Sequence, residues 1–218
     1  MILHRDDRLV AVDKPSGVAP HRGWADDDDA LLQLVRDAVD AYVYPIHRLD
    51  RGASGIVLFA LDKDAARALT DAWMSHQADK RYLAITRGHP PEHVVIDHPV
   101  LQRERDGDRV PAVTEVWRRE TFGRYALVEA RPITGRLHQI RRHLKHIACP
   151  LIGDVRYGKG EHNRLFRTEH GLHRLALHCT RLTVPHPDGS LLVVECGHPA
   201  DLAHAIASCR AAYGVSSP

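Results

Sequence analysis

The spacing of apolar and polar positions along the chain predicts a series of short strands and amphipathic helices. Residues 8–18 (RLVAVDKPSGV) predict a strand that ends in a Pro-Ser-Gly turn, with Lys14 at its end. Apolar residues with helical spacing predict one helix over 31–42 and a second over 63–77. Between them, the uninterrupted apolar run at 56–61 (IVLFAL) predicts a strand that is buried on both faces.

A further strand, predicted at 80–88 (KRYLAITRG), places a tyrosine away from the predicted core. Side chains of a strand alternate between its two faces, so Leu83 and Ile85 share one face and Tyr82 lies on the other. Tyr82 is therefore not required for packing of the core.

The rest of the chain continues mainly as hairpins. Residues 112–120 and 125–132 predict two strands joined by a turn, and 174–197 predict a hairpin that turns at an Asp-Gly pair. Residues 199–214 predict a final amphipathic helix that stops at a glycine. Consecutive hairpins with only three or four helices indicate an α+β fold, with a mainly antiparallel mixed β-sheet and flanking helices. We expect one compact domain over residues 1–218.

Composition restricts the class of protein. Apolar residues make up 44% of the 218 residues and charged residues 27%, which is typical of a soluble globular protein. No apolar run approaches the roughly 20 residues that a membrane helix needs, and the N-terminus shows no leader pattern. A cytoplasmic protein without membrane contact is expected. The four cysteines form no C-x-x-C pair, which argues against a zinc ribbon and a disulfide framework.

Positive charge is concentrated in one segment, although the net charge is only +2. Residues 135–146 (GRLHQIRRHLKH) carry six Lys, Arg or His side chains besides Arg136, and no acidic one. Four of them share one face of a predicted helix: His138, Arg141, Arg142 and Lys145. Like charges on one ridge repel each other, so a polyanionic partner explains the pattern better than the alternative, a solvated basic face.

Three other patterns are weak candidates for a metal-binding or catalytic site. His143 and His146 have helical i, i+3 spacing, but a zinc hydrolase needs a third ligand, and no H-E-x-x-H motif is present. Ser54 lacks the G-x-S-x-G elbow of a serine nucleophile. The acidic run at 25–30 is explained by capping of the following helix at Asp28 or Asp29. No metal ion is expected.

Asp50 is the strongest candidate for catalysis. It lies between Arg48 and Arg51 in the segment HRLDRGASG, directly before the apolar strand. One interpretation is a structural ion pair with either arginine. The other is a carboxylate that its cationic neighbours hold ionised, because such neighbours lower a carboxyl pKa by about 1 to 3 units. An ionised aspartate can act as a nucleophile.

The segment HRLDRGASG resembles the HRLDRxTSG signature of the RluA-type pseudouridine synthases. Four more segments resemble blocks of that family in the same order: VAVDKPSGV, KRYLAITRG, TGRLHQIRRHL and PLIGDVRYG. Together the blocks span residues 8–158. The sequence departs from the family at Ala53, where threonine is usual, and at Cys149, where histidine is usual. The resemblance implies the pseudouridine synthase catalytic fold, with two halves around a central cleft, and no cofactor.

The resemblance also implies roles for individual residues. Asp50 is the catalytic aspartate, Tyr82 packs on the target base, Arg136 pairs with Asp50, and Arg48 helps to extrude the nucleotide and fills the space it leaves. Whether the aspartate captures C1′ of the ribose or removes the 2′ proton stays open. The residues expected to contact RNA are Lys14, His21, Arg51, Lys80, His138, Gln139, Arg141, Arg142, Lys145 and Arg174.

The expected substrate is RNA, and finer details favour tRNA. Segments such as HRGW (21–24) and YGKGEHNRLFR (157–167) resemble a family member that modifies uridine 65 in the T-stem of tRNA. Two alternatives are a ribosomal RNA enzyme of the same family and a non-catalytic RNA-binding protein of this fold. No S4-like domain precedes residue 8, so the catalytic domain alone is expected to bind the substrate. No protein partner is implied, and a monomer is expected.

Overall fold

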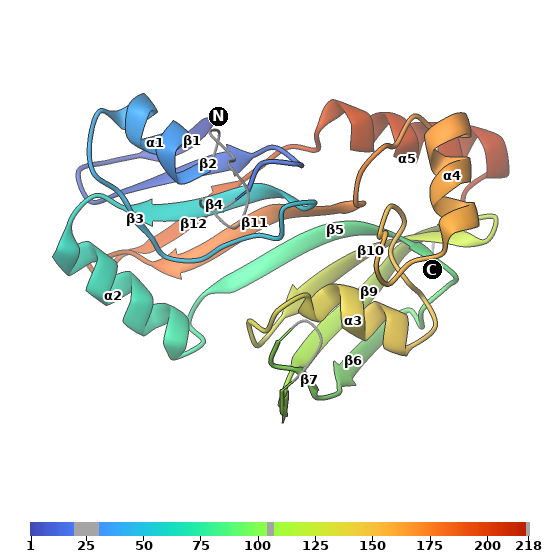
Figure 1. Cartoon of the computed structure of the whole chain (residues 1–218), viewed down its shortest axis with the longest axis horizontal. Helices are drawn as coiled ribbons and strands as arrows, with labels where there is room; N and C mark the ends of the chain where they lie inside the picture. Colours follow the sequence, from blue (N-terminus) through green and yellow to red (C-terminus); the bar gives the residue numbers. More distant parts are fainter. Residues whose placement is uncertain (20–30, 104–106, 217–218) are drawn as a thin grey trace. The chain divides into compact units, whose positions relative to one another are not determined.

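The computed structural model (Figure 1) describes residues 1–19, 31–103 and 107–216. Strands and helices alternate in a mixed, largely hairpin-linked order, and the predicted α+β fold class is confirmed. His21 and the acidic run that was expected to cap the first helix lie outside the described residues. In the part that is described, no helix combines the length and the apolar character needed to cross a membrane.

The chain divides into two compact units, and two chain segments form each of them. The first unit contains Met1–Lys80 and Cys179–Gly197, and the second contains Arg81–His178 and His198–Pro218. Each unit is described by itself.

The first unit is a sheet with two helices. Its strands are β1 (Ile2–Arg5), β2 (Leu9–Lys14), β3 (Tyr44–Pro45), β4 (Ser54–Ala60), β11 (Leu177–Pro185) and β12 (Leu191–Glu195), and its helices are α1 (Leu31–Val39) and α2 (Lys63–Met74). The order is β1-β2-β4-β11, with β12 beside β11 and β3 beside β4. In the antiparallel β2–β4 pair, Lys14 lies opposite Gly55. The first residues of β4 are thereby placed beside the turn that follows β2.

Local sequence explains why these elements form. All seven residues of β4 are buried, as the apolar run predicts for a strand covered on both faces. The α2 helix begins at Asp62, whose carboxylate accepts hydrogen bonds from the N–H groups of Asp64 and Ala65 at 2.9 and 2.8 Å. It ends three residues before the predicted end, because Ser75 and His76 leave the helical conformation.

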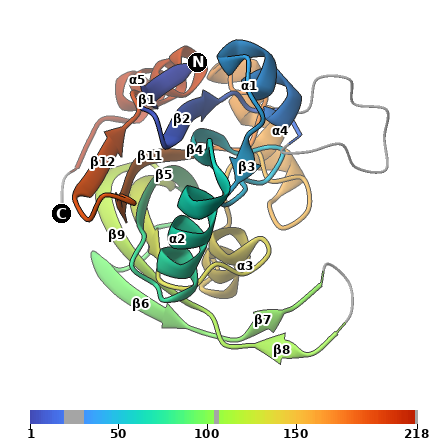
Figure 2. The same ribbon diagram turned by 90° about the vertical axis from the view of Figure 1, so that its left-hand side faces the viewer.

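The second unit has a four-stranded antiparallel sheet in the order β5-β10-β9-β6. Its strands are β5 (Asp79–Arg87, which begins in the first unit), β6 (His93–Asp97), β9 (Val113–Phe122) and β10 (Tyr125–Pro132), and β7 (Val100–Leu101) and β8 (Arg109–Val110) form a separate hairpin. Figure 2 shows this hairpin extending from β6 and β9. The helices are α3 (Gln139–His146), α4 (Gly160–Glu169) and α5 (Ala200–Tyr213).

The core of the second unit joins one face of the sheet to α4 and α5. Ile85 and, at its margin, Leu83 pack in this cluster, as their predicted alternation requires. Phe166 of α4 and Ile206 of α5 contribute from the helices. The prediction of three or four helices missed α4, so the described residues contain five. The α4 sequence is mostly polar, and its few apolar residues give no clear helical stripe.

Candidate active site

Asp50 occupies a tight turn directly before β4. The N–H of Ala53 donates to the carbonyl oxygen of Asp50 at 3.0 Å, which closes the turn. Leu49 and Ala53 are 4% and 1% exposed and fix the turn on both sides. The side chain of Asp50 is half-buried, whereas Arg48 and Arg51 are exposed. The carboxylate is thus held on a rigid backbone at the surface of a packed sheet.

The turn after β2 holds the Asp50 turn in place. Gly17 N–H donates to Arg51 O at 2.8 Å, and the Ser16 hydroxyl donates to Gly52 O at 2.7 Å. In return, Arg51 Nε donates to Gly17 O at 2.9 Å. These bonds join two turns that are more than 30 residues apart in sequence. Arg51, which was expected to contact RNA, therefore also has a structural role.

Lys14, a predicted contact to RNA, lies beneath both turns. Its side chain is 0% exposed. Its Nζ donates to Pro15 O at 2.9 Å, Val18 O at 2.8 Å and Arg51 O at 3.2 Å. Lys14 fastens the backbone that carries Asp50, and its contact with RNA stays a prediction.

Gly55 allows the close approach of another strand just after this turn. Its φ angle is +108°, which glycine adopts readily and other residues do not. A Cβ at this position would lie 2.2 Å from the carbonyl oxygen of Cys179 in β11 and 2.6 Å from its nitrogen. The second glycine of the GASG segment is thus required by packing.

Lys80, a predicted contact to RNA, packs against a half-buried aromatic pair. The His47 ring stacks on Trp73 with centroids 4.2 Å apart, and Lys80 Nζ lies 4.7 Å from the centroid of the same indole. Lys80 is only 7% exposed. Burial lowers the pKa of Lys80, although Cys179 and Asp79 oppose the effect. Burial, together with the charge of Lys80, lowers the pKa of His47 to about 3.

Tyr82 lies opposite Ala130 in the β5–β10 pair, on the face away from the Ile85 cluster. This placement agrees with the predicted alternation. The side chain is nevertheless 7% exposed, so it is more deeply buried than the sequence suggests.

The turn before α3 is built around the amide of Gln139, a predicted RNA contact. Gln139 is 4% exposed. Its Oε1 accepts from the Thr134 hydroxyl at 2.6 Å and from Arg136 N–H at 3.0 Å. Its Nε2 donates to Val113 O and to Thr114 Oγ1, both at 2.9 Å. Gln139 holds the backbone of Arg136, whose own side chain is exposed, and the contact of Gln139 with RNA stays a prediction.

Arg141 of the predicted cationic ridge is engaged in a buried ion pair. Its Nε and Nη2 donate to Asp154 Oδ2 and Oδ1 at 2.8 and 3.0 Å. The side chains of Arg141 and Asp154 are 11% and 0% exposed. Burial would raise the pKa of Asp154, but the bonds from Arg141 and from the N–H groups of Tyr157 and Arg156 hold it below its usual value. Arg141 therefore fixes the segment after α3, and its phosphate contact stays a prediction.

Arg142 is likewise used within the protein. Its Nη1 and Nη2 donate to Leu101 O and Arg103 O at 2.5 and 2.9 Å, which attaches the β7–β8 hairpin to α3. Its Nε donates to the Tyr157 hydroxyl at 3.0 Å. The contact of Arg142 with a phosphate stays a prediction.

The rest of the ridge also lies near Tyr157. His138 is half-buried, and its Nδ1 lies 3.1 Å from the Tyr157 hydroxyl. Lys145 is exposed, with Nζ 5.8 Å from the ring centroid. Of the four predicted ridge residues, Lys145 is the one whose side chain is exposed.

Arg174 and the two helical histidines also have structural contacts. Arg174, a predicted contact to RNA, donates to both carboxylate oxygens of Asp201 at 2.7 and 3.0 Å, and its side chain is 11% exposed. His143 is 0% exposed, with Nδ1 at 2.9 Å from Thr114 Oγ1 and Nε2 at 2.9 Å from His98 O. Across the described ranges, no group of three or more His, Cys, Asp or Glu side chains could hold a metal ion.

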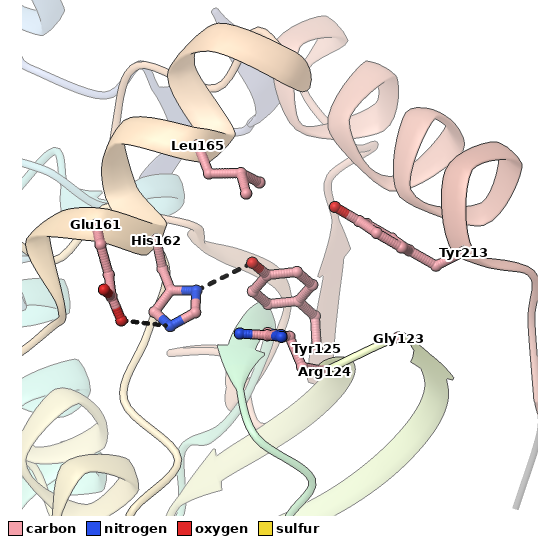
Figure 3. Close-up of a pocket in the computed structure, with 7 residues that line it drawn as sticks. All are labelled: Gly123, Arg124, Tyr125, Glu161, His162, Leu165 and Tyr213. Carbon is pink, nitrogen blue, oxygen red and sulfur yellow. Dashed lines mark hydrogen bonds and ion pairs between the residues drawn. The ribbon is translucent and has the colours of Figure 1, made fainter.

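A pocket that the sequence did not suggest lies at the other end of β5 and β10 (Figure 3). Its volume is about 690 Å³. It is lined by Gly123, Arg124, Tyr125, Glu161, His162, Leu165 and Tyr213. Tyr125 pairs with Arg87, five residues from Tyr82 along β5, which at about 3.4 Å per residue is roughly 17 Å. The pocket is thus separate from the position of Tyr82.

Comparison with known proteins defines the class. The family model described as RNA pseudouridylate synthase matches residues 8–146, and the chain belongs to this family. It is an RNA pseudouridine synthase, an isomerase, as the sequence motifs predict.

Individual relatives agree with this class. The chain is 38% identical over 207 residues to tRNA pseudouridine synthase C of Haemophilus ducreyi, with 85% of each chain covered. It is 38% identical over 219 residues to the protein of that name from Salmonella typhimurium, covering 90% of this chain and 84% of the relative. The structure of human RNA Pseudouridylate Synthase Domain Containing 4 matches with a TM-score of 0.80 and 29% identity, covering 100% of this chain and 94% of that one.

Proposed function

We propose that the protein converts one uridine of tRNA, uridine 65 of the T-stem, to pseudouridine, with Asp50 as the catalytic carboxylate. The observation that carries the proposal is the set of hydrogen bonds that fixes the backbone at Asp50. The turn after β2 and the buried Lys14 fix the backbone of the Asp50 turn. The side chain of Asp50 is half-buried and reaches the surface. The relatives that bear the name tRNA pseudouridine synthase C support tRNA as the substrate.

The reaction needs only one carboxylate. Uracil leaves through N1, turns, and rejoins the same ribose carbon through C5, so no redox cofactor is required. Asp50 either attacks C1′ and forms a glycosyl ester, like the nucleophile of a retaining glycosidase, or removes the 2′ proton. A water molecule must be kept from C1′ in the first route, because it would hydrolyse the ester.

The remaining residues are proposed to bring the uridine to Asp50. A base inside a helix is out of reach and has to be extruded, at a cost of a few kcal/mol. We propose that Arg48 fills the vacated space, that Tyr82 packs on the uracil ring, and that Arg136 pairs with Asp50. Arg48 and Arg136 both have exposed side chains, which such roles require. Among the predicted RNA contacts, Lys145 and Arg51 have exposed side chains, and we propose that both bind RNA phosphates.

Mapping of pseudouridine in defined transcripts tests the proposal. tRNA and ribosomal RNA transcripts are incubated with wild type, Asp50→Asn and the control Asp71→Asn, which changes an exposed aspartate of α2. We expect one modified T-stem uridine with wild type and the control, and none with Asp50→Asn. Modification of ribosomal RNA alone contradicts the tRNA assignment. Equal modification by Asp50→Asn contradicts the role of the aspartate.

A further inference from the structure

The pocket at the β9–β10 turn has an aromatic side that the fold holds rigidly. Tyr213, the last residue of α5, is 41% exposed. Its ring packs against Gly123, where a Cβ would lie 3.1 Å from two ring atoms. Gly123 has φ +57° and so provides both the turn and the space. The Tyr213 hydroxyl and His170 Nε2 are 3.4 Å apart, which orients the ring.

The chain beyond Tyr213 is also fastened to the sheet. Ser216 and Thr121 of β9 exchange two backbone hydrogen bonds, at 2.8 and 3.1 Å. These bonds prevent the end of α5 from fraying, so the Tyr213 ring is held beside the turn. Figure 3 shows it on one side of the pocket, facing Tyr125, Arg124 and Leu165.

The floor of the pocket is a buried polar pair. His162 is 5% exposed and Tyr125 is 1% exposed, and the Tyr125 hydroxyl lies 3.0 Å from His162 Nδ1. His162 Nε2 lies 3.2 Å from a carboxylate oxygen of Glu161, whose side chain is 79% exposed. These polar groups interact with one another, so they shape the floor of the pocket. The charge available to a ligand therefore comes from residues at the rim.

Arg124 and Glu161 are the charged residues that line the pocket. Burial lowers the pKa of His162, Glu161 raises it, and the nearby charges of Arg87, Arg124 and Lys159 lower it further. Arg124 and Lys159 are exposed. Over residues 1–19, 31–103 and 107–216, the guanidinium of Arg124 has neither a hydrogen bond nor an ion pair. Arg124 is therefore available to an anionic group of a ligand in this pocket.

We propose that this pocket binds a nucleotide, with its base on the ring of Tyr213 and its phosphate near Arg124. An exposed aromatic face and adjacent cations are the features with which proteins hold unpaired nucleotides. The volume of about 690 Å³ lies in the range of small-ligand sites. The nucleotide is one of the RNA substrate, roughly 17 Å from Tyr82 and distinct from the reacting uridine. This source of the nucleotide rests on the proposed function.

Binding of adenosine 5′-monophosphate and of a tRNA transcript tests the proposal. AMP is titrated into wild type, Arg124→Gln, Tyr213→Leu and Tyr213→Phe, and tRNA into the same changes on an Asp50→Asn background that does not convert it. The control is Arg181→Gln, an exposed arginine of β11 with a weak 3.8 Å ion pair to Glu195. Thermal unfolding shows whether Tyr213→Leu is folded. If Tyr213→Leu is not folded, Arg124→Gln still tests the proposal, because the Arg124 side chain is exposed and has no partner among the described residues.

The expected result is an AMP affinity that falls about tenfold in Tyr213→Leu, is retained in Tyr213→Phe, and falls by a similar factor in Arg124→Gln. The tRNA affinity should fall in the same variants, and Arg124→Gln should reduce the salt slope of binding by about 1. Loss of AMP affinity with unchanged tRNA affinity assigns the site to a free nucleotide. If both ligands bind Arg124→Gln and wild type equally, the site does not exist. Because AMP binding requires no turnover, it separates this inference from a failure of the proposed function.

Discussion

Replacement of Lys14 by methionine distinguishes a structural role of this lysine from a role in RNA binding. Methionine keeps most of the apolar stem and removes the Nζ donors. The carbonyl oxygens of Pro15 and Val18 lose donors at 2.9 and 2.8 Å, while Arg51 O keeps the Gly17 N–H at 2.8 Å. A buried carbonyl left without a partner costs about 1 to 3 kcal/mol. For two carbonyls we expect a loss of about 3 kcal/mol in the free energy of unfolding.

Such a loss corresponds to an increase of about 100-fold in the opening equilibrium of the Asp50 turn. Urea denaturation of wild type and Lys14→Met measures the free energy, and amide hydrogen exchange at Ala53 shows whether opening is local. Lys63→Met is a matched control, because Lys63 is an exposed lysine of α2 in the same unit.

A lysine that contacts phosphate would behave differently. Its loss would leave the free energy of unfolding unchanged and reduce the salt slope of RNA binding by about 1. If Lys14→Met shows that pattern, the assignment of Lys14 to the interior of the turn is refuted.

Three further results are expected. Arg141→Gln leaves the buried carboxylate of Asp154 without its ion-pair partner, so we expect the free energy of unfolding to fall by about 3 to 5 kcal/mol in urea denaturation. The salt slope of RNA binding should change little. A variant of wild-type stability with a lower salt slope would show instead that Arg141 contacts RNA. Gly55→Ala should unfold or lose activity, since its Cβ would lie 2.2 Å from a backbone oxygen; a wild-type melting temperature would refute the close approach. The pKa of His47 is lowered from 6.5 to about 3, so its contribution to stability is present above pH 6.5 and declines as pH falls toward 3. His47→Gln should therefore lose less stability than wild type between pH 6.5 and pH 3. Equal losses of stability in the two proteins would contradict the pKa shift.

Local patterns in the sequence identify the elements that carry the site. The apolar run before α2 predicts the buried strand β4 that follows Asp50, and alternation places Tyr82 opposite the Ile85 face. These features depend only on neighbouring residues. The motif around Asp50 supplies the class of enzyme, because a resemblance over several blocks carries information that periodicity does not.

The contacts of charged residues depend on distant parts of the chain, and sequence spacing does not reveal them. The helical face of α3 is cationic by composition, but Asp154 neutralises Arg141, and carbonyl groups of a hairpin some 40 residues earlier engage Arg142. Lys14 likewise meets a carbonyl 37 residues away. The pocket beside Tyr213 was missed for the same reason, since its lining comes from β9–β10, α4 and α5.

Release of tritium from tRNA labelled at C5 of uridine measures the central claim most directly, because C5 loses its hydrogen when it joins the ribose. The assay uses excess enzyme and a single turnover, and tRNA binding is measured in parallel. The account predicts that wild type releases one tritium per tRNA, and that Asp50→Asn releases none while it binds the same tRNA with similar affinity. Release by Asp50→Asn at the wild-type rate would contradict the account.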